Sequence, residues 1–107
     1  MSILEQIQGG ADLRRFSLRE LEQLCQEIRW EILRVVARNG GHLSSNLGAV
    51  ELTVALHYVY DLPRDKLLFD VGHQCYAHKL LTGRRRQFKT LRTYDGISGF
   101  PKITESA

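Results

Sequence analysis

A long amphipathic helix is the feature of this 107-residue chain that most restricts its fold. Ser17 is a typical N-cap residue, and Glu20 completes a capping box three positions later. A stop signal follows at residues 39–41, where an asparagine precedes two glycines. Between these signals, apolar side chains recur with a helical period of about 3.6 residues, at Leu18, Leu21, Leu24, Cys25, Ile28, Ile32, Val35 and Val36. The pattern predicts one helix over residues 18–38 with a single apolar face.

The rest of the chain contains shorter predicted elements. Residues 47–60 have little polar face, which predicts a second helix that is largely buried. Residues 66–71 form a short apolar run between turn signals, which favours a buried parallel strand. Residues 74–81 and 84–91 predict two short helices, and the tail from residue 93 has the glycine and proline content of a loop. This order of elements predicts an α/β fold. Because one strand does not make a sheet, we expect an incomplete part of a larger domain.

The composition favours a soluble protein without a disulfide framework. No apolar run approaches the roughly 20 residues of a membrane span, and the start of the chain lacks the pattern of a secretory signal, so we expect a cytoplasmic protein. Cys25 and Cys75 are too few for a disulfide scaffold or a four-cysteine metal site and are expected to be buried apolar groups. No carboxylate or histidine has ligand spacing with Asp70, so no metal site is predicted.

The charge is distributed unevenly. Residues 1–61 carry a net charge of −2, and residues 62–107 carry a net charge of +5. A basic second half suits an anionic ligand such as a phosphate ester, and it also suits nonspecific contact with nucleic acid. The basic cluster at residues 84–92 has two interpretations, a solvated helix face and a phosphate or subunit contact.

Two histidines lie in glycine-flanked loops that lead into predicted helices. His42 is in the loop 40–48, whose glycines would let the backbone approach a ligand closely. His73 follows the predicted strand at its carboxyl end, the edge where ligands bind in open α/β sheets. An imidazole there can donate to a phosphate or exchange a proton near neutral pH. The alternatives are an ordinary helix–helix turn and a structural histidine. His57 and His78, inside predicted helices, are expected to be packing or surface residues.

Several blocks of the sequence together resemble the 1-deoxy-D-xylulose-5-phosphate synthase family. They occur in the order and spacing of that family, and they comprise residues 40–48, 50–57, 70–74, 78–79, 82–84 and 99–102. The likeness extends from about Asp12 to Ser106, and transketolases have a related two-histidine arrangement. The resemblance implies a transketolase-like thiamine-diphosphate-binding domain. Residues 1–107 would be its truncated N-terminal part, helix-rich with a short parallel strand.

The resemblance also implies an activity and roles for the two histidines. Synthases of this family are transferases that condense pyruvate with glyceraldehyde 3-phosphate, with loss of CO2, for isoprenoid, thiamine and pyridoxal synthesis. They use thiamine diphosphate and Mg²⁺. By resemblance, His73 contacts the cofactor, and His42 lies near the substrate as a candidate proton donor or acceptor. The family's magnesium ligands and cofactor-activating glutamate lie beyond the matching blocks, so no Mg²⁺ ligand is expected here.

Two hypotheses about the whole protein follow. In the first, the chain is an N-terminal fragment of a homodimeric synthase, inactive in isolation and without nucleic-acid or membrane partners. In the second, it is a stand-alone interaction module whose basic second half binds nucleic acid or an acidic partner. A steep loss of binding with added salt, and no preference for thiamine diphosphate, would distinguish the second from the first.

Overall fold

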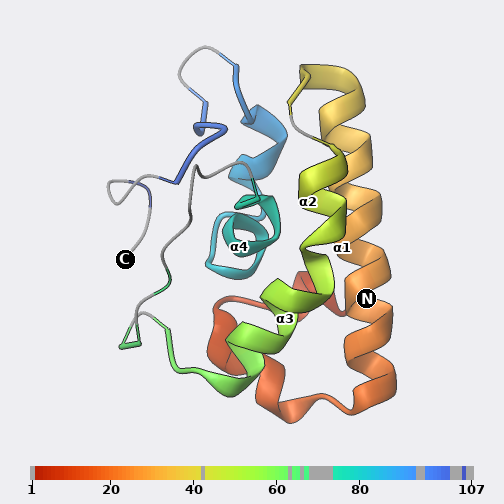
Figure 1. Ribbon diagram of the computed structural model, residues 1–107, viewed down its shortest axis with the longest axis vertical. Coiled ribbons are helices and arrows are strands. Elements are labelled where there is room, and N and C mark those ends of the chain that lie inside the picture. Colours follow the sequence, from red (N-terminus) through yellow and green to blue (C-terminus); the bar gives the residue numbers. More distant parts are fainter. Residues whose placement is uncertain are drawn as a thin grey trace.

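Every regular element in the described part of the chain is helical (Figure 1). The computed structural model describes residues 2–41, 43–62, 64–65, 67, 74–93, 96–101 and 105. Its α-helices are α1 Leu18–Asn39, α2 Ser44–Gly48, α3 Val50–Val59 and α4 Tyr76–Leu81, and its 3-10 helices are η1 Leu4–Gln6, η2 Gly10–Arg15 and η3 Gln87–Thr90. The predicted helix-rich architecture is confirmed. The strand predicted at residues 66–71 lies outside the described residues, apart from Leu67, and stays a prediction.

The ends of α1 are formed by the signals that its sequence contains. The Ser17 backbone N–H donates to the Glu20 carboxylate at 2.8 Å, and the Glu20 N–H donates to the Ser17 hydroxyl at 3.2 Å. This capping box satisfies two backbone donors that a helix start leaves free. At the other end, Gly40 has a φ of +80° and donates its N–H to the Val36 carbonyl at 2.8 Å. The predicted helix and both of its boundary signals are confirmed.

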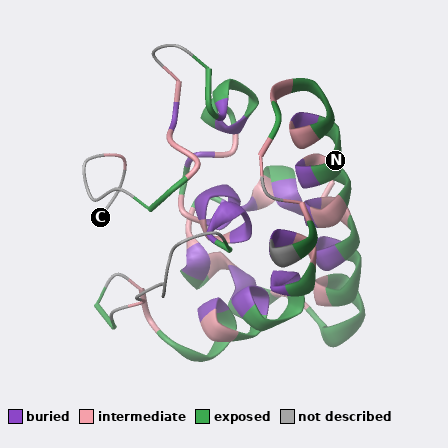
Figure 2. Ribbon diagram, turned by 45° about the horizontal axis from the view of Figure 1, so that its top comes forward, coloured by how far each residue is buried: buried purple, intermediate pink, exposed green. Residues whose placement is uncertain are grey.

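The hydrophobic core surrounds α4. Figure 1 shows this short helix in the middle of the molecule, with α1 and α2 on its right and α3 below it. Its buried residues are Tyr76, Ala77, Lys79, Leu80 and Leu81, and the buried face of α1 comprises Leu24, Cys25, Ile28, Ile32 and Val35. Figure 2 shows the outer side of α1 exposed and the buried colour gathered toward α4. The apolar stripe predicted for α1 therefore faces the core.

The predicted second helix is wrong in two respects. It is divided into α2 and α3 at Ala49, whose ψ of 5° departs from helical geometry. It is also less buried than predicted, because Leu52 and Val59 of α3 are 63% and 65% exposed. In the part of the chain that the structure describes, α3 packs on η2, α1, α2 and α4 along one side, which leaves its other side uncovered.

The N-terminal segment packs on the core although its sequence shows little pattern. Ile3, Leu4, Ile7 and Leu13 are all buried. The Leu4 N–H donates to the Glu27 carboxylate of α1 at 2.7 Å, which anchors η1 on the long helix. The basic helix predicted at residues 84–91 is shorter than expected, since only η3 forms there. None of the helices in the described ranges is long and apolar enough to cross a membrane.

Candidate functional site

The two histidines selected from the sequence, His42 and His73, lie outside the described residues. Their roles therefore stay predictions. The structure does describe the residues that adjoin them in the sequence, which are Gly41 and Leu43 beside His42, and Gln74 beside His73. The geometry of the candidate site is built from these neighbouring segments.

The segment before His42 has a backbone that requires glycine. Gly40 and Gly41 have φ values of +80° and +136°, in the region that side chains with a Cβ rarely adopt. A Cβ on Gly41 would also lie only 2.6 Å from the Tyr76 hydroxyl oxygen. The group that approaches the Gly41 backbone closely in the described structure is the Tyr76 phenol, and the predicted approach to a ligand stays a prediction.

A buried hydrogen bond joins the segment after His42 to the segment after His73. Asn46 of α2 is 1% exposed, and its side-chain oxygen accepts the backbone N–H of Tyr76 at 3.0 Å. Tyr76 is fully buried and is the first residue of α4. Helix α2 and the start of α4, whose bonded residues lie 30 positions apart in the sequence, are thereby held against each other. Sequence reasoning selected the loop 40–48, which contains Asn46, but missed its partner Tyr76, because no spacing rule connects the two residues.

Three charged side chains form a buried cluster on α4 and the segments beside it. The Glu105 carboxylate accepts from Lys79 Nζ at 2.8 Å and from Arg84 Nη1 at 2.9 Å. It also accepts the Ser98 backbone N–H at 2.9 Å, and Lys79 donates to the Ser98 carbonyl. Burial raises the pKa of Glu105, but the hydrogen bonds from Lys79 and Ser98 and the two cations outweigh it and lower that pKa. Lys79 and Arg84 therefore share one carboxylate, Glu105, as their ion-pair partner within the fold.

The basic cluster predicted at residues 84–92 is divided between the interior and the surface. Arg84 is 5% exposed and belongs to the buried ion cluster. Arg86, Lys89 and Arg92 are exposed. Their exposure is compatible with both interpretations, a solvated face and a phosphate or subunit contact, whereas Arg84 is part of the packed interior.

His57, which is buried, and His78, which is half-buried, form a pair that the sequence pattern did not reveal. His57 Nε2 and His78 Nδ1 share a hydrogen bond of 2.9 Å. Burial lowers the pKa of His57 to about 4. Burial, followed by the charges of His57, Arg84 and Lys79, lowers the pKa of His78 to about 3. Both rings are consequently neutral at pH 7, and their expected role as packing residues agrees with this geometry.

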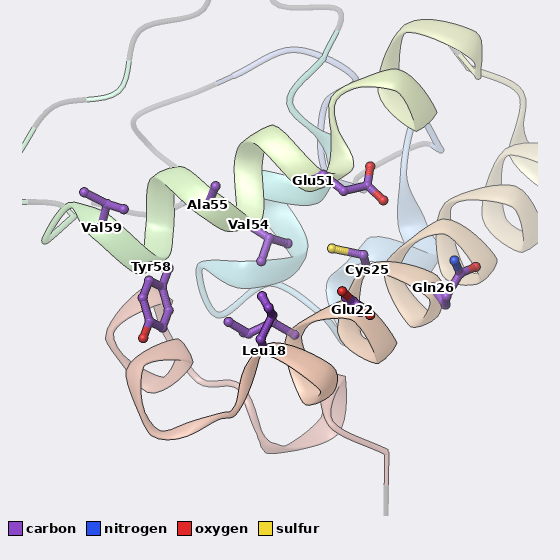
Figure 3. A pocket seen from close by; sticks show the side chains of 10 residues that line it. Leu18, Glu22, Cys25, Gln26, Glu51, Val54, Ala55, Tyr58 and Val59 are labelled. Carbon is purple, nitrogen blue, oxygen red and sulfur yellow. The ribbon is translucent and has the colours of Figure 1, made fainter.

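A groove of about 510 Å³ lies between α1 and α3 (Figure 3). Most of the side chains that line it are apolar, including Leu18, Val54 and Val59. Cys25 contributes a thiol, but burial raises its pKa to about 11, so the reactive thiolate is absent at neutral pH. The groove therefore offers no activated nucleophile.

The cysteines and the carboxylates give no metal centre in the described structure. Cys25 and Cys75 are both buried free thiols, as expected from the sequence. Burial is the largest influence on Cys75 and raises its pKa as well. Among the residues that the structure places, no group of three or more histidine, cysteine, aspartate or glutamate side chains could hold a metal ion.

Comparison with known proteins identifies the family. Residues 4–107 match the family model described as 1-deoxy-D-xylulose-5-phosphate synthase. The chain is 62% identical over 104 residues to the 1-deoxy-D-xylulose-5-phosphate synthase of Thermus thermophilus, and 60% identical over 104 residues to that of an Anaeromyxobacter species. It is 59% identical over 106 residues to the synthase of Desulfitobacterium hafniense. This chain belongs to the 1-deoxy-D-xylulose-5-phosphate synthase family.

The match covers nearly all of this chain and a small part of its relatives. It includes 97% of the chain for the Thermus and Anaeromyxobacter proteins and 99% for the Desulfitobacterium protein. The chain spans 17%, 16% and 17%, respectively, of the length of these three synthases. The family resemblance inferred from the motif blocks is thus confirmed.

Proposed function

We propose that this chain is the N-terminal portion of a synthase that condenses pyruvate with glyceraldehyde 3-phosphate and releases CO2. The observation that carries the proposal is the match of residues 4–107 to the family model, supported by 62% identity to the Thermus enzyme. The parent enzyme would be a cytoplasmic homodimer, and its product would enter isoprenoid and thiamine synthesis.

Within that enzyme, we assign His73 to contact thiamine diphosphate and His42 to exchange a proton with the bound substrate. The cofactor supplies the electron sink for decarboxylation when it is bound. Histidine suits the second role because its unperturbed pKa lies near neutral pH. A shared site is supported by the buried hydrogen bond from Tyr76 to Asn46, which holds together the segments that follow the two histidines.

The described residues fit only part of what the cofactor needs. A magnesium diphosphate requires oxygen ligands for the metal and donors for the phosphate oxygens. The described ranges contain no group that could hold the metal, and Lys79 and Arg84 are already paired with Glu105. We therefore assign the magnesium ligands to other parts of the parent enzyme. The isolated chain is expected to show no turnover, because most of the groups that stabilise the transition state lie elsewhere.

The interaction-module hypothesis receives less support from the structure. Two cations of the basic half, Lys79 and Arg84, are buried in ion pairs and are unable to contact a phosphate backbone. The exposed basic residues around η3 are few for a site whose affinity would depend mainly on neutralised phosphates. Nucleic acid and membrane are accordingly not among the proposed partners.

A chimeric enzyme tests the proposal. This chain replaces the aligned 104-residue segment of the Thermus thermophilus synthase, and product formation from pyruvate and glyceraldehyde 3-phosphate is measured with and without thiamine diphosphate. We expect thiamine-diphosphate-dependent activity within about tenfold of the parent. His42→Ala should lower it by roughly 10²–10⁴-fold, the usual contribution of a positioned acid or base.

The exposed Arg86 provides a matched control, since Arg86→Gln should leave the activity unchanged. A folded chimera without activity would refute the proposed function. A His42→Ala chimera as active as the unmodified one would refute the assigned role of that histidine and leave the family assignment intact.

A further inference from the structure

The first turn of α4 is capped by a side chain from another helix. Tyr76 begins α4, so its backbone N–H is one of the donors that lack a partner within the helix. The neighbouring N-cap residue, Cys75, makes no side-chain capping bond. The acceptor is instead Asn46 of α2, 30 positions earlier, at 3.0 Å and almost fully buried. A bond formed at such a sequence distance determines where α4 begins relative to α2.

The Tyr76 side chain provides a second contact between the same two regions. Its phenol oxygen lies where a Cβ on Gly41 would meet it at 2.6 Å, so the ring is pressed against the backbone that precedes His42. A further contact comes from Phe88, whose ring meets the Tyr76 ring edge-on with centroids 5.7 Å apart. Because Tyr76 is fully buried between these neighbours, it has little room to shift away from the glycine.

The residues that make these contacts are close to the two candidate histidines in the sequence. Gly41 directly precedes His42 and Asn46 follows it by four positions, whereas Tyr76 follows His73 by three positions. We propose that Asn46 and Tyr76 are positioning residues, which hold α2 and the Gly41 backbone against the start of α4 and act on the reaction through the histidines adjoining these segments in the sequence, without touching the cofactor or the substrate. The contacts of Tyr76 with Asn46 and Gly41 are observed, and their consequence for catalysis rests on the proposed function.

The proposal distinguishes between substitutions at one position. Asn46→Ala removes the acceptor and leaves the Tyr76 N–H buried without it, whereas Asn46→Asp retains an oxygen in nearly the same place. Gly41→Ala acts from the other side, since the added methyl group must displace Tyr76 and must adopt a φ of +136°. A loss on Asn46→Ala that Asn46→Asp restores would identify the hydrogen bond, rather than the general packing of α2, as the cause.

Amide hydrogen exchange measured on the 107-residue chain directly tests the hydrogen bond from the Tyr76 N–H to Asn46. In the unmodified chain, the Tyr76 amide should exchange at least about a hundredfold more slowly than in an unstructured peptide. Asn46→Ala should accelerate that exchange by about tenfold or more, and Asn46→Asp should retain most of the protection. A Tyr76 amide that exchanges at the peptide rate in the unmodified chain, or is unaffected by Asn46→Ala, would overturn the proposal.

The chimeric synthase tests whether the loss of this hydrogen bond affects catalysis. Asn46→Ala should raise its apparent KM for thiamine diphosphate or lower its kcat by about tenfold, with Asn46→Asp close to the unmodified chimera. Full activity of the Asn46→Ala chimera would overturn the positioning role while leaving the proposed function standing. An inactive unmodified chimera would overturn the proposed function and the positioning role together, so the two failures are distinguishable.

Discussion

Mild acid should destabilise this chain through the hydrogen-bonded pair of His57 and His78. His57 is 1% exposed, and its Nδ1 has no hydrogen-bond partner in the described structure. Its Nε2 is bonded to His78, and the charged groups that act on this second ring, Lys79 and Arg84, are cations. Protonation of either ring would therefore add a positive charge near two cations that share a single carboxylate, Glu105.

The pKa values determine the size and the sign of the effect. Burial lowers the pKa of His57 to about 4, and burial with nearby positive charge lowers that of His78 to about 3, against 6.5 for an unperturbed histidine. The unfolded chain therefore binds more protons than the folded chain below pH 6.5, and the free energy of unfolding decreases as the pH falls. Each histidine contributes about 1.4 kcal/mol per pH unit. At pH 5, the loss is about 2 kcal/mol for one histidine and about 4 kcal/mol for both.

Urea unfolding followed by circular dichroism measures this loss. The free energy of unfolding of the unmodified chain is determined at pH 7.5, 6.5, 5.5 and 5, and the same series is recorded for His78→Gln. A small domain has only about 5–15 kcal/mol of stability in total, so the predicted change is readily resolved. The variant removes one titrating ring and retains a polar partner for His57. Its free energy of unfolding should therefore decrease about half as much between pH 7.5 and pH 5 as that of the unmodified chain.

Two results would refute this reasoning. One is a free energy of unfolding that stays constant between pH 7.5 and pH 5. The other is a pH dependence in His78→Gln as steep as in the unmodified chain, which would assign the effect to other groups, including His42 and His73.

Three further predictions concern single side chains. Glu105→Gln should lower the free energy of unfolding by about 3 kcal/mol in urea, because it leaves the buried Lys79 and Arg84 without their counter-charge; a change below about 1 kcal/mol would contradict the buried cluster. Gly10→Ala should lower the free energy of unfolding by about 1–3 kcal/mol, since the added Cβ would lie 2.4 Å from His57 Nδ1. Gly9→Ala is a matched control that should leave this free energy nearly unchanged, because no atom lies within 4 Å of its Cβ. Cys25, with its pKa raised to about 11, should react with iodoacetamide at pH 8 at least about tenfold more slowly in the folded than in the unfolded chain, and equal rates would contradict its burial.

Local sequence signals predicted the parts of the fold that depend on neighbouring residues. The capping box at Ser17 and the stop at Gly40 set the bounds of α1, because those bonds form between residues three or four positions apart. The same kind of reasoning failed for the N-terminal segment. The burial of Ile3 and Leu13 depends on packing against distant helices, and Glu27 binds the Leu4 amide across 23 positions. No periodic pattern records such contacts.

The candidate site shows the same division between local and distant information. The sequence marks positions 40 and 41 as glycines, and their positive φ values show that the backbone there requires glycine. The partner of Gly41 is Tyr76, which no spacing rule connects to it. The buried Lys79–Glu105–Arg84 cluster was equally hidden, because a basic run predicts a solvated face unless an acidic residue from elsewhere folds onto it.

The intact mass of the native gene product tests the central claim most directly. The protein would be captured from its source cells with an antibody to this chain and measured by mass spectrometry. Because the chain spans 16–17% of its relatives, the predicted mass is about six times its own 12.3 kDa. A mass near 12.3 kDa would contradict the claim that this chain is one part of a complete synthase.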